Sequence, residues 1–107
     1  MALAKIKIRW WVYLLRCADR SLYCGITLDL KRRINEHNAS NKGARYTRGR
    51  RPVQLAWSEA QRSHSLALKR ELQIKRLTRS GKERLIERKK NPARLIQRAG
   101  RSKLKPA

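Results

Sequence analysis

The sequence predicts an α+β domain in which helices flank a small three-stranded antiparallel sheet, in the order β-β-α-β-α-α. Residues 6–17 and 22–27 are rich in β-branched and aromatic side chains and flank a short polar turn, which is the pattern of a β-hairpin. Later segments begin with helix-capping residues and carry apolar side chains at helical spacing. At 107 residues, the chain is long enough for one domain with a modest core.

The turn of this hairpin decides whether Tyr13 and Tyr23 can act together. Side chains alternate between the two faces of a strand, so a two- or four-residue loop would place these rings on opposite faces of the sheet. A three-residue loop at residues 19–21 would place them on the same face and would give Arg20 a left-handed backbone. The same loop would send the two cysteines to opposite faces. The alternative is that both tyrosines are ordinary strand aromatics.

Capping residues and periodicity define the elements expected after the hairpin. They are a helix from the Thr27 cap to about Asn38 with Asp29 in its first turn, a polar loop at 39–51, a strand at 52–59, a helix at 63–77, and a helix at 80–90 that begins with a capping box at Ser80. We assign residues 8–86 to one domain. Glu87 is the last acidic residue, so residues 87–107 are expected to form a basic extension that is partly disordered.

The charge of the chain is strongly unbalanced. Its formal net charge is +22, from 29 basic and 7 acidic residues. Self-repulsion at this charge opposes compactness, so the imbalance indicates a polyanionic partner, most simply nucleic acid. A ribosome-associated or generally adhesive basic protein is the alternative.

No membrane or secreted location is expected. The longest strongly apolar run, residues 10–15, is much shorter than the ~20 residues of a bilayer span. Arg16 ends this run too early for the apolar region of a signal peptide. We therefore expect a cytoplasmic protein in which Cys17 and Cys24 stay reduced and fill apolar space.

Two adjacent arginines of the first predicted helix differ in their surroundings. Residues four apart share a helix face, so Arg32 is expected to form an exposed pair with Glu36. Arg33 instead shares a face with His37, beside an apolar stripe. A cation at the edge of the core without a nearby acid suits an anion, and a guanidinium can donate two parallel hydrogen bonds to phosphate. We select Arg33; His37 is either a site residue or a half-buried structural histidine.

Glu71 is a scarce carboxylate within an amphipathic helix. Ala67 and Leu68 lie one turn before it and Ile74 one turn after it, which places it near the inward face. A carboxylate there is a natural Mg²⁺ ligand, because one carboxylate plus substrate phosphates can suffice for this ion. The alternative is a surface pair with Lys75.

Candidate nucleic-acid contacts lie outside this set. Gly25 has no side chain and would let a ligand or a backbone approach the sheet closely. The polar loop supplies cations and one aromatic ring that could contact phosphates and stack on a base, or could simply be solvated. These loop candidates are Arg45, Tyr46, Arg48, Arg50 and Arg51.

The order of these residues resembles the core of the GIY-YIG nuclease superfamily. Val12-Tyr13-Leu14 and Tyr23-Cys24-Gly25 occupy the places of its two motifs, although only the tyrosines and the glycine match literally. The resemblance covers most of the chain. It is closest to small standalone bacterial members and to the Slx1-type nuclease domain, in residues 13–19, 43–47 and 65–71.

This resemblance implies roles for the candidate residues. Tyr13 would help to activate water, and Tyr23 would support the phosphate or the nucleophile. Arg33 would stabilise the phosphate, with His37 following it at the expected helical spacing, and Glu71 would hold one Mg²⁺. Cations around Tyr13 are expected to lower the pKa of its hydroxyl, since a tyrosine is otherwise a poor base.

The sequence therefore predicts a Mg²⁺- or Mn²⁺-dependent endonuclease of the GIY-YIG type that hydrolyses phosphodiester bonds in DNA. Branched or damaged DNA in repair or recombination is the expected substrate, and the sequence identifies no protein partner. The alternative is a catalytically idle module that binds structured RNA or DNA. The catalytic candidates are Tyr13, Tyr23, Arg33, His37 and Glu71, of which Glu71 is also the metal ligand.

Overall fold

A computed structural model describes residues 9–90 and has the predicted α+β fold. Its sheet contains β1 (Trp10–Arg16), β2 (Leu22–Thr27) and β3 (Gln54–Gln61) in the order β2-β1-β3, and β1 is antiparallel to both neighbours. The central strand supplies most of the core, since residues 12–15 are at most 1% exposed. The three predicted strands are confirmed; the part of the first that precedes Arg9 lies outside the described residues.

The register of the hairpin confirms that the two tyrosines share a face. Tyr23 lies opposite Leu15, and Gly25 lies opposite Tyr13. Directly opposed residues point to the same side of a sheet, and Leu15 is two residues from Tyr13, so both tyrosine rings lie on one face. Their ring centroids are 6.4 Å apart.

The turn has three residues, as predicted, but it lies one position earlier. The N–H of Cys17 donates to the carbonyl of Ser21 at 2.9 Å, which leaves residues 18–20 as the loop. Arg20 has a φ of 70°, the left-handed conformation that closes a three-residue hairpin loop. The shift by one residue keeps the parity of the loop, and therefore the shared face.

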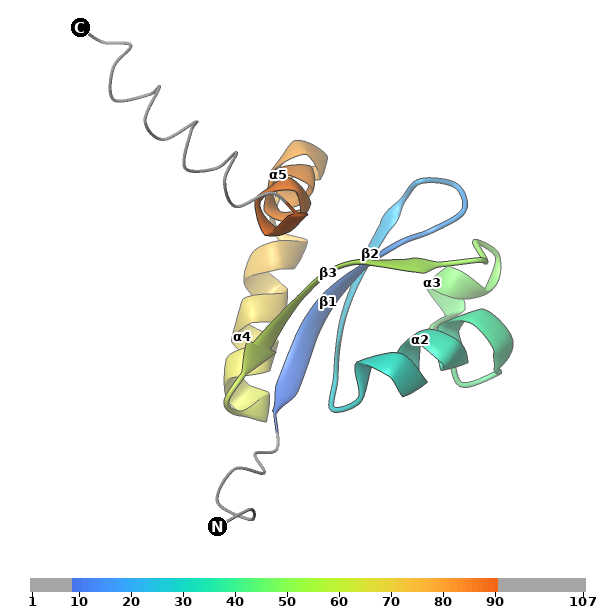
Figure 1. Ribbon diagram of the computed structural model, residues 1–107, viewed down its shortest axis with the longest axis horizontal. Helices are drawn as coiled ribbons and strands as arrows, with labels where there is room; N and C mark the ends of the chain where they lie inside the picture. Colours follow the sequence, from blue (N-terminus) through green and yellow to red (C-terminus); the bar gives the residue numbers. More distant parts are fainter. Residues whose placement is uncertain (1–8, 91–107) are drawn as a thin grey trace, which may run out of the picture. The chain divides into compact units, whose positions relative to one another are not determined.

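The sheet separates two helical layers (Figure 1). The helices α2 (Leu30–Ala39) and α3 (Arg45–Arg48) lie on one side of it, and α4 (His64–Lys75) lies on the other. On the α2 side, Tyr13 and Leu15 pack with Val53 and Ile34. This layer holds the face that carries both tyrosines.

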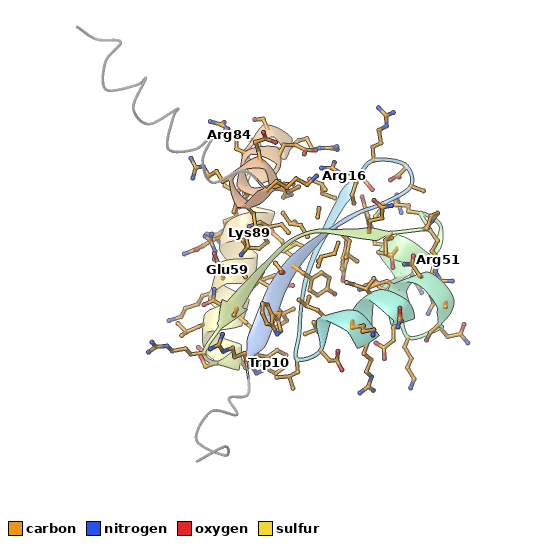
Figure 2. All side chains as sticks on the ribbon, in the orientation of Figure 1. Trp10, Arg16, Arg51, Glu59, Arg84 and Lys89 are labelled. Carbon is orange, nitrogen blue, oxygen red and sulfur yellow. The ribbon has the colours of Figure 1, made fainter. Side chains whose placement is uncertain are left out.

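Contacts with β3 hold α4 on the face of the sheet that is opposite to α2. The guanidinium of Arg70 lies 5.9 Å from the centre of the Trp57 ring and donates to Glu59 at 2.8 Å. Figure 2 shows Glu59 on the β3 side that faces α4. Trp57 lies opposite Leu14, so this face alternates with the one that carries Tyr13.

The structure corrects the predicted cap of α2 and confirms that of α4. Asp29, not Thr27, is the N-cap of α2: its carboxylate accepts from the N–H of Arg32 at 3.1 Å. The Thr27 hydroxyl instead accepts from the N–H of Asp29 at 3.2 Å and steadies the chain before the helix. Ser63 caps α4, and this predicted start is confirmed.

The predicted polar loop at 39–51 is not entirely a loop, because it contains the single-turn helix α3. The end of this segment is fastened by Asn38, whose side chain exchanges two hydrogen bonds with the backbone of Val53, at 2.7 and 3.0 Å. Arg51 donates to the carbonyls of His37 and Ser40, both at 2.6 Å, beside the end of α2 (Figure 2).

The chain divides into two compact units, the first ending at Arg76 and the second beginning at Leu77. The second unit contains α5 (Arg79–Lys90), which buries Ile86. Thr78 rather than Ser80 caps this helix, because its hydroxyl accepts from the N–H of Gly81 at 3.1 Å. The predicted tail beyond residue 90 lies outside the described residues. In the part of the chain that the structure describes, no helix is long and apolar enough to cross a membrane.

Candidate active site

A buried hydrogen-bonded chain lies at the centre of the candidate site. The hydroxyl of Tyr13 is 2.9 Å from Nε2 of His37, and Nδ1 of His37 is 2.9 Å from the hydroxyl of Thr47. Each of the three residues is at most 1% exposed. These hydrogen bonds join β1, α2 and α3, so the three residues come together only in the tertiary fold.

Two glycines leave the space that the Tyr13–His37–Thr47 hydrogen bonds need. A Cβ atom on Gly25 would lie 2.5 Å from the Tyr13 hydroxyl oxygen, and one on Gly43 would lie 2.8 Å from the carbonyl oxygen of Glu36 and from Cα of His37. Either contact is shorter than a real Cβ makes. The space over Gly25 is therefore filled by Tyr13 itself, whereas the sequence suggested a ligand or a backbone there.

Arg33 lies where helical phase predicts, at the edge of this buried chain. Its side chain is 27% exposed, against 71% for Arg32. The prediction that Arg33 has no nearby acid is wrong: its Nη1 donates to Glu36 at 2.9 Å and to the carbonyl of Lys42 at 2.7 Å. The expected pair between Arg32 and Glu36 also forms, at 3.3 Å. Glu36 thus accepts hydrogen bonds from both arginines, because its side chain can reach the residues three and four positions before it.

Tyr23 and Tyr46 continue the site toward the surface. The ring of Tyr23 lies 5.2 Å from that of His37, edge-on, and 5.8 Å from that of Tyr46, nearly parallel. Tyr23 is half-buried and Tyr46 is 39% exposed. The aromatic rings therefore form a path from the buried histidine to solvent.

Glu71 approaches the site from the other layer, at the β2 edge of the sheet. Its side chain is 17% exposed and pairs with Lys75 at 3.3 Å, which was the alternative to metal binding. Ala67 and Ile74 on the same helix are fully buried as expected, but Leu68 is 45% exposed. Burial raises the pKa of the Tyr23 hydroxyl, cations at Arg33 and Lys75 oppose this, and the Glu71 carboxylate adds to it, so Glu71 acts on Tyr23 electrostatically.

The pKa of the Tyr13 hydroxyl is raised to about 12, and burial is the main cause. A hydrogen bond from Arg33 opposes this shift without overcoming it. The expectation that cations lower this pKa is therefore wrong, because the loss of solvation is larger than the attraction of one guanidinium. Tyr13 is protonated at neutral pH.

His37 is neutral at neutral pH. Burial and the nearby cations, Arg33 before Arg51, lower its pKa to about 4, although Glu36 acts in the opposite direction. A neutral imidazole carries one N–H and one unprotonated nitrogen, so it can donate to one neighbour and accept from the other. The structure makes His37 a buried residue rather than the half-buried one considered from the sequence.

The donor set for a metal is small. Among residues 9–90, no three histidine, cysteine, aspartate or glutamate side chains gather as a metal-binding group. Within residues 9–90, Glu71 is the carboxylate that acts on Tyr23, which fits an ion that takes its other ligands from water and substrate phosphates, as Mg²⁺ and Mn²⁺ do. It does not fit an ion that needs a complete protein cage.

The basic loop residues divide into structural and exposed members. Arg51 holds the end of α2, as described above. Arg50 stacks on the Tyr46 ring at 4.0 Å and pairs with Asp19 at 2.9 Å. Arg48 is exposed and donates to the carbonyl of Asn41 at 2.7 Å.

Arg45 is also exposed, and within residues 9–90 its side chain forms no ion pair or hydrogen bond. Arg45 and Arg48 are therefore the loop cations best able to meet a ligand.

Sequence reasoning missed the part played by Thr47 and Gly43. Both fall in the segment 43–47, which carried the family resemblance but received no role. That local match was the available signal. Periodicity could not reveal it, because the decisive contacts of both residues are with α2, which is a separate element.

Comparison with known proteins defines the class. The family model described as the GIY-YIG catalytic domain matches residues 9–85, most of the chain, and the chain belongs to the GIY-YIG family. The predicted family resemblance is confirmed. The match gives the chain a nuclease-type domain, whose class of substrate is nucleic acid.

The particular relatives are small proteins called UPF0213. The chain is 54% identical over 78 residues to the UPF0213 protein DP2720 of Desulfotalea psychrophila, covering 73% of this chain and 71% of that protein. It is 47% identical over 85 residues to a UPF0213 protein of Syntrophus aciditrophicus, covering 79% and 95%. The solution NMR structure of the UPF0213 protein BH0048 from Bacillus halodurans is 46% identical and covers 74% of this chain and 83% of that chain, with a TM-score of 0.49. None of these three names states an activity.

Proposed function

We propose that the protein is a divalent-metal-dependent endonuclease that hydrolyses phosphodiester bonds in DNA. The observation that carries the proposal is the arrangement around the buried Tyr13–His37 pair. Tyr23 contacts the His37 ring, Arg33 interacts electrostatically with both tyrosines, and Glu71 acts on Tyr23 from the adjacent edge. A phosphodiester hydrolase needs an activated water, neutralisation of the phosphate charge and help for the leaving oxygen. These residues can supply each of the three.

Arg33 neutralises the phosphate. Burial alone would lower the pKa of Arg33, but its hydrogen bonds to Glu36 and Tyr13 raise it, so the guanidinium stays charged. Its interactions with Glu36 and Lys42 fix it in place before a substrate binds. A cation fixed in advance needs little reorganisation when charge develops on the phosphate.

Tyr13 helps to activate water together with His37. A hydroxyl with a pKa of about 12 does not act as a preformed tyrosinate. It can take a proton from water as its own proton passes to Nε2 of neutral His37. The hydroxide oxygen then bonds to phosphorus, and the phosphorus–oxygen bond of the leaving group breaks with its electron pair on that oxygen. Tyr23 supports the phosphate at the mouth of the site.

Glu71 would hold Mg²⁺ or Mn²⁺. The ion would supply charge stabilisation for the leaving oxygen. Lys75, which pairs with Glu71, would have to give up this contact, and its half-exposed ammonium can turn to solvent when it does.

The proposed substrate is DNA in the cytoplasm, with branched or damaged structures in repair or recombination as the first to test. Arg45 and Arg48 would contact phosphates, and Tyr46 could stack on an unpaired base. The Tyr46 ring already contacts Tyr23 and the Arg50 guanidinium, so Arg50 would have to move aside for a base to stack there.

Substitution of the two charged residues tests this proposal. Arg33→Ala and Glu71→Ala should each lower cleavage of a panel of flap, nicked and junction DNAs by about 100-fold or more, because each removes charge stabilisation of the transition state. Binding of the same DNAs should survive. The measurement is single-turnover cleavage beside an equilibrium binding assay.

Matched controls come from the same helices or the same residue types. Arg32→Ala removes the neighbouring, exposed arginine of α2, and Glu83→Ala removes a carboxylate of α5; both should cleave at the wild-type rate. Wild-type cleavage by both Arg33→Ala and Glu71→Ala would disprove the assignment of the site.

One observation favours a second candidate, a binding module that does not cleave. Glu71 is already neutralised by Lys75, and the Tyr13 hydroxyl resists ionisation. Cleavage measured with Mg²⁺, with Mn²⁺ and with a chelator separates the two. Cleavage that requires the ion supports the endonuclease, and binding without cleavage under every condition supports the module.

A further inference from the structure

The donor and the acceptor of each hydrogen bond between Tyr13, His37 and Thr47 can be assigned. The Tyr13 hydroxyl is buried, so its proton needs an acceptor within the fold. The Tyr13 proton points to Nε2 of His37, at 2.9 Å. An unprotonated Nε2 on a neutral imidazole leaves the ring proton on Nδ1.

The other end of the chain is consistent with this direction. The hydroxyl of Thr47 donates its single proton to the carbonyl of Ala44, at 2.9 Å. The same hydroxyl oxygen can therefore only accept from Nδ1 of His37, at 2.9 Å. In this direction the protons of Tyr13, His37 and Thr47 each have an acceptor, and only the long contact of 3.4 Å from the N–H of Ala44 to Nδ1 is given up.

The reverse direction leaves the buried Tyr13 hydroxyl proton without its acceptor. With the ring proton on Nε2, Nδ1 would accept from Thr47 and from the N–H of Ala44, which lies 3.4 Å away. The Ala44 carbonyl would keep the N–H of Thr47 as a donor, at 3.1 Å, but Nε2 could no longer accept from the Tyr13 hydroxyl, for which residues 9–90 offer no other hydrogen-bond acceptor. A buried polar group that loses its partner is costly, so the first direction is favoured.

We propose that Thr47 is a positioning residue that holds His37 in the tautomer protonated on Nδ1, so that Nε2 accepts the proton of Tyr13. The catalytic consequence rests on the proposed nuclease function, in which Tyr13 can release its proton only to an unprotonated nitrogen. Thr47 reaches the reacting atoms through His37 and Tyr13 and does not touch substrate.

The tautomer is measured directly by NMR of the ring nitrogens in ¹⁵N-labelled protein. The chain has two histidines, and His64→Gln removes the signals of the exposed one without touching the buried chain. We expect His37 of the wild type to be neutral, with its proton on Nδ1. A proton on Nε2 would overturn the proposal.

Two substitutions test whether Thr47 is responsible. Thr47→Val keeps the shape and removes the acceptor, and we expect the His37 proton to move to Nε2. The Thr47→Ser variant keeps the hydroxyl and should keep the wild-type tautomer. An unchanged tautomer in Thr47→Val would overturn the role of Thr47. If Thr47→Val does not fold, the spectra of the wild type and of Thr47→Ser decide, since a proton on Nε2 in either one contradicts the proposal.

The kinetic effect should fall on the chemical step. We expect Thr47→Val to lower kcat by about 100-fold or more, since proton transfer by a positioned side chain contributes at least this much, with KM changed by less than about 2-fold. Thr47→Ser should restore cleavage to within about 3-fold of the wild type. An equal rise in KM with kcat unchanged would contradict a positioning role.

The two proposals can fail separately. If the wild type cleaves no substrate, the nuclease proposal fails, while the ring-nitrogen spectra still decide the tautomer. If Arg33→Ala and Glu71→Ala abolish cleavage but His37 carries its proton on Nε2, only the inference about Thr47 fails.

Discussion

At the scale of single residues, the candidate site depends on a position without a side chain. Gly25 is directly opposite Tyr13 in the hairpin, and the Tyr13 hydroxyl lies where a Cβ atom of residue 25 would be. The ring can lie flat across β2 and reach His37 only because this space is empty. The glycine of the second motif thus explains the placement of the tyrosine of the first.

Gly25→Ala should damage both stability and the site. The new methyl group would force Tyr13 away from His37, and we expect a loss of about 1–3 kcal/mol in the free energy of unfolding, typical of overpacking. Urea unfolding measures this change. Gly49→Ala is the matched control, because a Cβ there meets no atom within 4 Å. Equal stabilities for the two variants would contradict the packing argument.

Neighbouring arginines show what residue-level reasoning can reach. Helical phase distinguishes Arg33 from Arg32 correctly, because phase depends only on spacing along the helix. It fails for Glu36, which pairs with both arginines. The rotamer that allows this is selected by the surroundings of α2, and spacing carries no information about them.

At the scale of elements, the start of α2 sets the direction in which Arg33 and His37 point. Asp29 caps this helix and satisfies the N–H of Arg32. The sequence offers Thr27 and Asp29 as caps two residues apart, and both are good capping types. The choice depends on where the chain leaves β2, which the sheet decides.

Asp29→Ala should destabilise the protein by about 1 kcal/mol, the usual cost of losing a capping side chain. Denaturant unfolding monitored by circular dichroism measures the loss. Asp29→Asn retains an oxygen that can accept from Arg32 and should stay within about 0.5 kcal/mol of the wild type. A loss in Asp29→Asn as large as in Asp29→Ala would show that charge, and not capping, matters at this position.

The hairpin illustrates why an element can be predicted and its turn misplaced. The strands follow from composition, and the same-face requirement on Tyr13 and Tyr23 fixes the parity of the loop. A loop at 18–20 and a loop at 19–21 have the same parity. The left-handed Arg20 belongs to both, so the local sequence does not distinguish them.

At the scale of the whole molecule, the net charge of +22 should dominate binding to nucleic acid. If six or more phosphates are neutralised, affinity for duplex DNA should fall by about 1,000-fold or more between about 50 and about 200 mM salt, through counterion release. Fluorescence anisotropy at several salt concentrations measures the slope.

Arg45→Ala should reduce the magnitude of that slope by about one, the contribution of a single phosphate contact. The control is Glu83→Gln, which removes no cation and should leave the slope unchanged or steeper. A flat salt response of the wild type would argue against any electrostatic mode of binding.

Stability should also depend on pH through His37. Its pKa is about 4 in the folded protein and 6.5 without the fold, so between these values the unfolded chain binds more protons. The free energy of unfolding should therefore fall as the pH is lowered from about 7 to about 5, by at most about 1.4 kcal/mol per pH unit from this one group. Asp19 and Glu36 have lowered pKa values and act below this window.

Urea unfolding at several pH values checks the window. His37→Gln should remove most of the dependence, and His64→Gln, at an exposed position, should keep it. A wild-type stability that stays level down to about pH 5 would contradict the burial of a neutral histidine.

The sequence by itself determined the fold class, the three strands, the shared face of Tyr13 and Tyr23, the position of Arg33 at the edge of the core, and the family. These follow from period, parity and local composition, which are properties of neighbouring residues. Only the tertiary structure decided that Tyr13 and His37 are buried, that the pKa of Tyr13 is raised rather than lowered, and that Thr47 completes their chain. Burial and desolvation depend on segments far apart in the sequence, so the balance between a nearby cation and lost water becomes defined only when the chain has folded.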